Sequence, residues 1–330
     1  MNLSELKKVL IIRLSSLGDI LLSTPLIRTL KEKSPQMEID FVLKERYKDI
    51  LDLNPYLNKV FEYPDITGEL TRLMEELKAG NYDLVLDLQN NFRSKKIVSF
   101  LRIPKLKFNK MDLRKMLLVH FKINRLKDAP QIPLRYSNVF KDIHLDNYGL
   151  DLFTNKSPSA LYRENKKYIG FCPGSRHFTK MWPKEYYVEL GNILKNNNYN
   201  VALFGGKDDI DICREISLQI QDSINLCSND DILQTAADMK KCEAIVCNDS
   251  GLMHTACAEK IPVLVFFGST VKEFGFTPYQ NKNIILENNS LSCRPCSHIG
   301  KSYCPKGHFR CMLELKPDIA FTKLSLLLNQ

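Results

Sequence analysis

The chain has 330 residues, of which 44% are hydrophobic and 26% are charged, and its formal net charge is +9. This length and composition suffice for two domains with buried cores and exclude a disordered chain. No run of about 18 apolar residues occurs, so a membrane-spanning helix is not expected. The first residues also lack the cleavage site of a signal peptide, and we therefore expect a cytoplasmic protein.

The positive charge is concentrated in the first half of the sequence. Residues 93–127 contain twelve basic residues and a single acid, Asp112. A solvated helix face usually mixes charges of both signs, and this segment does not. The imbalance indicates an anionic partner, which is a phosphorylated substrate, an acidic lipid surface or a nucleic acid. No aromatic-rich RNA-binding motif accompanies it, which argues against nucleic acid.

The first half alternates strand and helix patterns. Because the strands are continuously apolar and are separated by helices, they predict a parallel sheet covered on both faces. A further helix is predicted near residues 134–149. The predicted strands are 9–14, 38–43, 59–63 and 82–88, and the helices that follow them are about 19–33, 46–53, 66–79 and 91–102.

The second half repeats this alternation after a polar connection near residues 150–166. The sequence therefore predicts an α/β protein with two doubly wound halves, and the cleft between them is the expected site. The predicted strands are 168–174, 200–206, 243–249 and 262–270, and the predicted helices are 183–197, a segment ending near 220, 250–260 and a last helix from about 316.

Several strand ends carry residues suited to binding phosphate, although the glycine motifs of dinucleotide and P-loop sites do not occur. In Asp249-Ser250-Gly251 the polar residues suit a helix N-cap, and Gly251 lets a ligand approach the free N–H groups of the first helical turn. His254 lies one turn further and can add a donor. Plain helix capping is the alternative interpretation.

Two more loops follow predicted strands. Residues 173–183 contain hydroxyl and cationic side chains, and Lys180 is suited to stabilising a leaving diphosphate. An exposed loop with a packed Trp182 is the alternative. Residues 204–209 contain two glycines followed by Asp208, which either accepts hydrogen bonds from ribose hydroxyls or caps the next helix.

A lone carboxylate, Asp19, follows the first strand in the stretch IIRLSSLGDILLSTP. If a donor phosphate binds the second half, this carboxylate is placed to take a proton from an attacking hydroxyl. The alternative is an acid that interacts only with the dipole of its own helix. Spacing alone does not decide between the two.

Five stretches together resemble glycosyltransferase family 9, the ADP-heptose:lipopolysaccharide heptosyltransferases. The resemblance implies a GT-B fold: an acceptor-binding Rossmann-like domain at residues 1–160, a nucleotide-sugar-binding one at 161–315, and a last helix, 316–330, that packs back on the first domain. The matching stretches are IIRLSSLGDILLSTPLIRTLK, YDLVLDLQNNFRS, PGSRHFTKMWPKEYY, CNDSGLMHTACAEKIPVLVFFGST and CRPCSHIGKSYCPKGHFRCM.

The resemblance also implies roles for single residues in an inverting, metal-independent transfer of heptose to the lipopolysaccharide inner core. Asp19 would be the general base and Lys180 the contact to the donor phosphate. The D-[ST]-G-x-x-H element would hold the diphosphate and sugar of ADP-heptose. The residues expected at the donor are Ser175, Arg176, Lys180, Asp208, Asp249, Ser250, Gly251 and His254.

A cluster of four cysteines lies near the end of the chain. Cys293, Cys296, Cys304 and Cys311 have the composition of a structural zinc site, but their spacing is tighter than in common zinc ribbons. Reduced or partly disulfide-linked packing is the alternative. No cofactor is expected to be required for catalysis, and Asp209-Ile210-Asp211 falls within a predicted helix, so we interpret this D-x-D sequence as a chance match.

The basic segment falls in the half that the resemblance assigns to the acceptor. Arg93, Lys95 and Lys96 are the expected acceptor contacts, because Kdo–lipid A carries carboxylates and phosphates. Such an acceptor implies peripheral contact with the anionic inner face of the inner membrane. The alternatives are a family 9 transferase with another donor or acceptor, and a non-catalytic nucleotide-sugar-binding protein.

Overall fold

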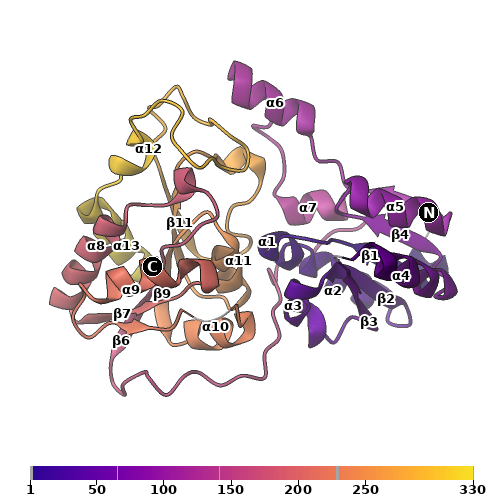
Figure 1. Cartoon of the computed structure of the whole chain (residues 1–330), viewed down its shortest axis with the longest axis horizontal. Coiled ribbons are helices and arrows are strands. Elements are labelled where there is room, and N and C mark those ends of the chain that lie inside the picture. Colours follow the sequence, from indigo (N-terminus) through magenta and orange to yellow (C-terminus); the bar gives the residue numbers. More distant parts are fainter. Residues whose placement is uncertain (1–2, 65, 141, 228–229, 330) are drawn as a thin grey trace. The chain divides into compact units, whose positions relative to one another are not determined.

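The structure is a computed structural model, and it describes residues 3–64, 66–140, 142–227 and 230–329. Its contacts divide the chain into two compact units. Unit 1 consists of Met1–Lys110 and Ile132–Phe153, and unit 2 of Met111–Gln131 and Thr154–Gln330. Each unit is built on one parallel sheet with helices around it (Figure 1).

The sheet of unit 1 has the strand order β3-β2-β1-β4-β5, and every strand pair is parallel. The central strand is buried from Val9 to Ile12, as expected for a strand covered on both faces. This confirms the predicted parallel sheet. The strands are β1 (Lys8–Ile12), β2 (Glu38–Lys44), β3 (Lys59–Tyr63), β4 (Leu84–Asp87) and β5 (Lys105–Lys107).

The helix predicted over 19–33 is divided in two. The hydroxyls of Ser23 and Thr24 donate to the carbonyls of Ile20 and Leu21, and the next residue, Pro25, has no N–H to continue the helix. The helices of unit 1 are α1 (Leu17–Leu21), α2 (Thr24–Lys33), α3 (Asp49–Asp52), α4 (Thr67–Ala79), α5 (Phe92–Leu101) and α7 (Ile132–Ser137), with short 3-10 turns η1 (Leu3–Glu5) and η2 (Glu45–Tyr47).

The prediction of a helix over residues 134–149 is wrong beyond its first turns, because α7 ends at Ser137. The chain that follows is held by the buried guanidinium of Arg28, which binds the carboxylates of Asp146 and Asp151 and the carbonyl of Gly149. Gly149 itself has a φ of 76°, which a helix does not accommodate. These contacts fix an irregular segment against α2.

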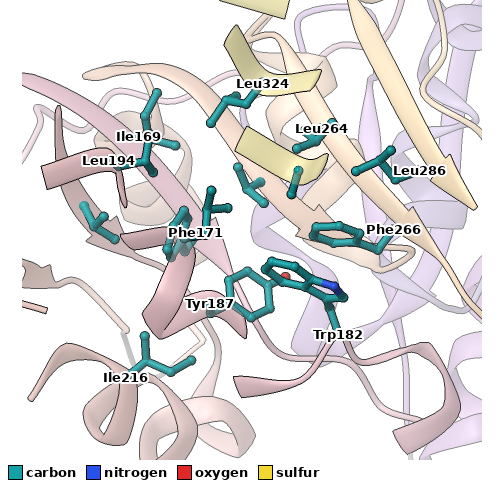
Figure 2. Close-up of a cluster of buried hydrophobic side chains, with 14 of the residues drawn as sticks. Ile169, Phe171, Trp182, Tyr187, Leu194, Ile216, Leu264, Phe266, Leu286 and Leu324 are labelled. Carbon is teal, nitrogen blue, oxygen red and sulfur yellow. The ribbon is translucent and has the colours of Figure 1, made fainter. Parts of the chain in front are cut away.

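The sheet of unit 2 has the strand order β11-β10-β9-β6-β7-β8 and is also parallel. Its core contains Trp182 stacked on Phe266 with ring centroids 4.2 Å apart, beside Tyr187 and Phe171 (Figure 2). The strands are β6 (Lys167–Cys172), β7 (Tyr199–Leu203), β8 (Ile224–Asn225), β9 (Cys242–Asn248), β10 (Val263–Phe267) and β11 (Asn283–Glu287).

The helices of unit 2 include three that the sequence did not predict, namely α6, α10 and α12. The helices among the described residues of this unit are α6 (Asp112–Phe121), α8 (Lys184–Asn196), α9 (Ile210–Ser217), α10 (Ile232–Met239), α11 (Gly251–Ala258), α12 (Arg310–Leu313) and α13 (Pro317–Asn329), with 3-10 turns η3 (Phe178–Lys180), η4 (Lys207–Asp209) and η5 (Lys272–Phe274).

The last helix, α13, packs within unit 2. It contacts α8, β10 and β11, and Ala320, Leu324 and Leu327 are fully buried in the core of that unit. This helix thus belongs to the core of unit 2, and the expectation that residues 316–330 pack back on the N-terminal domain stays a prediction. The apolar face of the helix covers the sheet of unit 2, and Leu324 lies beside Leu264 and Ile169 in Figure 2.

Residues 111–131 belong to unit 2, whereas the sequence suggested a single boundary near residue 160. Lys122 Nζ donates to the carbonyls of Cys293 and Pro295, at 3.1 and 2.7 Å. Leu118 and Leu126 pack on Phe274. The chain therefore passes between the units more than once, because residues 111–131 add α6 to unit 2 before residues 132–153 complete unit 1.

Candidate active site

The turn after β1 places the carboxylate of Asp19 at the carboxyl end of the sheet of unit 1. Arg13 Nη2 lies 2.5 Å from Asp19 Oδ1. The backbone N–H and the hydroxyl of Ser16 donate to Oδ2, at 3.1 and 2.7 Å. Both carboxylate oxygens are thus held, and 15% of the side chain remains exposed. The sequence predicted the position of this acid but not its partners.

The environment of Asp19 keeps the carboxylate ionised. Burial alone would raise its pKa, but the charge of Arg13 and the hydrogen bonds from Ser16 and Arg13 outweigh burial, so the pKa lies below the usual value. A carboxylate with a lowered pKa is available as a proton acceptor at neutral pH, although its intrinsic basicity is modest. The geometry therefore supports a base that is oriented and charged before substrate binds.

Two residues that sequence reasoning missed hold this turn in place. Gln89, directly after β4, accepts hydrogen bonds from the N–H groups of Leu14 and Ser15, at 2.9 and 3.2 Å. Arg13 Nη1 donates to the carbonyl of Leu88, at 2.6 Å. The available signal was a polar residue at the end of a buried strand, because carboxyl ends of neighbouring parallel strands meet at one sheet edge.

The basic residues expected at the acceptor lie on α5. Arg93, Lys95 and Lys96 are all exposed on this helix, and Phe92 beside them is 85% exposed. Asn91 caps the helix by accepting from the N–H of Ser94, at 3.1 Å. The three cations are thus presented to solvent, as contacts to an anion require, and their role remains a prediction.

In unit 2, Lys180 lies at the end of η3 and its ammonium is oriented by a carboxylate. Lys180 Nζ is 2.8 Å from Asp249 Oδ2, and the hydroxyl of Thr270 donates to the same oxygen at 2.7 Å. The side chains of Lys180 and Asp249 are 15% and 8% exposed. The structure brings the predicted lysine and the predicted aspartate together, and Asp249 forms a direct ion pair with Lys180.

The N-terminus of α11 carries polar groups that lack partners. Ser250 is the N-cap residue but its side chain makes no capping hydrogen bond, and its Oγ is buried without a partner in the part of the chain that the structure describes. Ser269, fully buried after β10, has an Oγ in the same situation. The Ser250 hydroxyl beside the open N–H groups of α11 suits an anionic ligand. His254 is buried one turn further along α11.

The loop that carries Lys180 is fixed by Asn248, the fully buried last residue of β9. Its amide donates to the carbonyl of Pro173 at 2.8 Å, and its Oδ1 accepts from the N–H of Trp182 at 2.9 Å. Both ends of the loop are therefore anchored to the strand that precedes α11. Between these anchors, Ser175 is partly buried and Arg176 is exposed.

In the third loop Asp209 is half-buried, whereas Asp208 is exposed. A Cβ at Gly174 would clash with the carboxylate of Asp209, and one at Gly205 would lie 2.6 Å from its Cβ. Asp209 Oδ2 accepts from the N–H of Gly206 at 3.1 Å, and burial raises the pKa of this carboxyl. Asp208 is exposed on η4, and its predicted contact to ribose is untested.

Asp209 therefore caps the 3-10 turn η4 by accepting from the N–H of its N-cap residue, Gly206, and its side chain makes no capping hydrogen bond to α9. It precedes Ile210 at the start of α9, and Asp211 is exposed within that helix. The two carboxylates of the D-x-D sequence lie in different environments, one against the glycines and one in solvent. The interpretation of the D-x-D sequence as a chance match stays a prediction.

Comparison with known proteins tests the resemblance. The sequence profile of glycosyltransferase family 9 (heptosyltransferase) matches residues 70–306. This chain belongs to glycosyltransferase family 9. It is similar to lipooligosaccharide heptosyltransferase 2 of Haemophilus ducreyi, with 29% identity over 97% of this chain and 99% of the relative.

Solved structures of family 9 proteins share the fold. The glycosyltransferase family 9 protein of Veillonella parvula aligns with a TM-score of 0.78 at 20% identity, covering 99% of this chain and 98% of the other. The E. coli ADP-heptose LPS heptosyltransferase II aligns with a TM-score of 0.74 at 26% identity, covering 98% and 99%. The predicted GT-B fold with two Rossmann-like domains is confirmed, and the chain is a glycosyltransferase.

The four clustered cysteines of this family 9 chain lie in the loops between β11 and α12 and at the second residue of α12, and all four are free thiols. Cys293 Sγ lies 3.8 Å from His308 Nε2. Among the described residues, no three His, Cys, Asp or Glu side chains are arranged to hold a metal ion. Burial, with a smaller contribution from the nearby thiols of Cys293, Cys296 and Cys304, raises the pKa of the Cys311 thiol to about 11. A zinc ion at these four cysteines stays a prediction.

Proposed function

We propose that this enzyme is an inverting heptosyltransferase that transfers heptose from ADP-heptose to the lipopolysaccharide inner core, with Kdo–lipid A or a heptosyl residue as acceptor. Family membership supports transfer of a sugar. The names of similar proteins support heptose and ADP-heptose, because the relatives are heptosyltransferases and one is an ADP-heptose LPS heptosyltransferase. The observation that carries the mechanism is the ionised, doubly held carboxylate of Asp19.

In the proposed reaction, Asp19 takes the proton from the acceptor hydroxyl as this oxygen attacks the anomeric carbon. The bond from that carbon to the diphosphate breaks on the opposite face, so ADP leaves with the bonding electron pair and the configuration inverts. Arg13 and Ser16 hold the carboxylate, which fixes the direction in which it accepts the proton. The carboxylate needs no rearrangement before it acts.

Unit 2 is proposed to hold the donor. The ammonium of Lys180 and the N–H groups at the start of α11 would balance the charge that develops on the departing diphosphate. The buried hydroxyls of Ser250 and Ser269 would donate to the phosphate oxygens, which would give both groups the partners they otherwise lack. Asp249 would orient Lys180 and, with Ser250, Gly251 and His254, would hold the diphosphate and sugar.

The acceptor and the location of the enzyme are part of the same proposal. Arg93, Lys95 and Lys96 would bind the carboxylates and phosphates of the acceptor, since all three are exposed on α5. The enzyme would then work on the cytoplasmic side, in peripheral contact with the anionic inner membrane. Among the described residues, no helix has the length and apolar character that crossing a bilayer requires.

Metal independence is also proposed. Lys180 and the α11 N-terminus supply positive charge for the diphosphate, which is the role a divalent ion has in other sugar transferases. A zinc ion at the cysteine cluster would be structural. Elemental analysis of protein purified without a His tag tests this part: one zinc per chain supports the site, and its absence together with fully titratable thiols contradicts it.

The proposal is tested by a donor screen read out by mass spectrometry. Wild-type enzyme is incubated with a defined Kdo–lipid A acceptor and with ADP-heptose, UDP-sugars or GDP-sugars in parallel. We expect a product one heptose heavier from ADP-heptose alone. Efficient transfer from a UDP- or GDP-sugar would support a family 9 enzyme with a different donor, and donor binding without any transfer would support the non-catalytic alternative.

A further inference from the structure

Helix α6 and the loop after it carry apolar side chains on the outside of unit 2. Leu113 is 66% exposed, Met116 44%, Phe121 64% and Ile123 47%, and all four fall within eleven residues. Exposed apolar residues are common on protein surfaces, but they are usually scattered singly. Four in one helix and its C-terminal end form a patch that folding does not explain. Figure 1 shows α6 set away from the helices that cover the second sheet.

The other side of α6 is already used for packing. Leu118 is buried, and together with Leu126 it packs against Phe274 from η5, with Val119 also in this cluster. The helix is therefore apolar on its packed side and on its solvent side. The second apolar side of α6 is therefore left uncovered by the described fold and is available to a partner.

The charge around this patch identifies the kind of partner. Arg114, Arg125 and Lys127 are exposed beside it, and Asp112 and Asp128 are the acids of the same segment. Lys115 lies 3.8 Å from Asp112, so the acid at the start of α6 faces a cation of its own helix. The basic excess adjoins apolar side chains, a combination typical of helices that lie in the interface of an anionic bilayer.

The neighbouring cysteine loop extends the same character. Lys122 Nζ is bound to the carbonyls of Cys293 and Pro295, which fixes the end of α6 against this loop. On the loop, Ile299 is 56% and Tyr303 66% exposed, and Lys301 and Lys306 are exposed as well. Apolar and basic side chains thus continue from one segment to the next within unit 2.

We propose that this α6 surface, formed by Leu113, Met116, Phe121 and Ile123 with Arg114, Arg125 and Lys127, docks unit 2 on an anionic lipid bilayer. The apolar side chains enter the boundary between headgroups and acyl chains, and the cations contact lipid phosphates. The inference deepens the proposed function, because it rests on an acceptor that lies in a membrane. The residues of the α6 surface are distinct from those proposed to bind the substrates or to take part in the chemistry.

Binding to vesicles tests the proposal. Full-length protein is sedimented with vesicles of phosphatidylcholine alone, or of phosphatidylcholine with phosphatidylglycerol, at low and high salt. We expect binding only to the anionic vesicles, weakened by salt. Each neutralised cation should lower the partition coefficient by about fivefold, so the double variant Arg114→Gln/Arg125→Gln should bind roughly 25-fold more weakly. The variant Leu113→Asn/Phe121→Asn removes two apolar side chains and should lose binding to the anionic vesicles even at low salt.

Matched controls come from exposed residues elsewhere in unit 2. Leu218 is 79% and Ile319 41% exposed, so Leu218→Asn/Ile319→Asn removes comparable apolar surface, and Lys166→Gln/Lys241→Gln removes two exposed cations. Both controls should bind vesicles as the wild type does. Thermal unfolding of every variant, followed by circular dichroism, establishes that each one is folded.

Several results would overturn the inference. Equal binding by the α6 variants and the controls would place the membrane contact elsewhere, and self-association that the Leu113→Asn/Phe121→Asn variant abolishes, without vesicle binding, would assign the patch to a second copy of the chain. Transfer to an acceptor dispersed in detergent separates this question from the proposed function. The α6 variants should retain wild-type transfer there, whereas failure of the wild type in that assay would count against the proposed function alone.

Discussion

The charge of Arg13 keeps the carboxylate of Asp19 ionised, which burial would otherwise disfavour. A carboxyl group removed from water favours its protonated form, and a protonated carboxyl cannot accept a proton. The guanidinium at 2.5 Å and the two donors of Ser16 reverse this preference. The proposed base is therefore part of a small charged unit, and changes to the arginine should appear as changes in how activity depends on pH.

Asp19→Asn tests the base directly. The amide cannot take a proton, so we expect kcat to fall by about 10²–10⁴-fold, while the dissociation constant of the donor, measured by calorimetry, stays within about twofold of wild type. The matched control is Asp211→Asn, which changes an exposed aspartate of α9. A variant that keeps more than a tenth of the wild-type rate would show that Asp19 is not the base.

Arg13→Met tests the pKa argument. The pKa of Asp19 lies below its usual value in the wild type, so its protonation removes activity only at pH values below the ordinary range of an aspartate. With the positive charge gone, burial is left to raise that pKa, and the acidic limb of kcat/KM against pH should move to higher pH. An unchanged acidic limb in the folded variant would contradict the assignment.

Lys180 and Asp249 should behave as a coupled pair. Lys180→Met is expected to raise the KM for the donor and to lower kcat, because the ammonium is proposed to act on the diphosphate. Asp249→Asn should have a smaller effect, since it leaves the cation in place but unoriented, and it should add little in the Lys180→Met background. Steady-state kinetics of the two single variants and the double variant measure the coupling. Fully additive effects would show that Asp249 does not act through Lys180.

The residues of the site differ in how far the sequence could predict them. Asp19, Lys180 and Asp249 follow strands, and a position after a strand is readable from the hydrophobic pattern. Their partners are not, because Gln89 and Thr270 are distant in sequence from the groups they hold. Asp249 also makes a contact that the sequence did not predict, since its carboxylate binds Lys180 in the structure. Its contact to the diphosphate and sugar, which the resemblance implies, stays a prediction.

Among the elements, the buried strands were predicted well, whereas the edge strands β5, β8 and β11 were not predicted. The continuous apolar runs of β1 and β10 need no partner information, because both faces of each strand are buried. The helix expected over 134–149 failed because Arg28 binds its second half in an irregular form. Helix α6 was missed since its apolar residues face two directions, which weakens the periodic signal on which a prediction relies.

Helix α13 offers a prediction at the scale of an element. Leu324 is fully buried against the core of unit 2, while Leu326 on the same helix is 49% exposed. We expect Leu324→Ala to lower the free energy of unfolding by about 2–5 kcal/mol and Leu326→Ala to change it by less than about 0.5 kcal/mol. Urea unfolding followed by circular dichroism measures both; equal effects would contradict the packing described for α13.

For the whole molecule, the sequence predicted two parallel sheets because repeated strand–helix alternation leaves few other arrangements. It did not predict that the chain gives residues 111–131 to unit 2 before completing unit 1. That exchange depends on contacts such as Lys122 with the carbonyl of Pro295, which link segments more than a hundred residues apart. The net charge of +9 remains consistent with an anionic acceptor and an anionic surface.

The stereochemistry of one turnover tests the central claim most directly. Wild-type enzyme is given ADP-heptose and a defined Kdo–lipid A acceptor, and the anomeric configuration of the new bond is compared with that of the donor by NMR. Direct attack by a hydroxyl that Asp19 deprotonates predicts a product with inverted configuration. Retention of configuration, which attack on the face opposite the leaving diphosphate cannot give, would contradict the account.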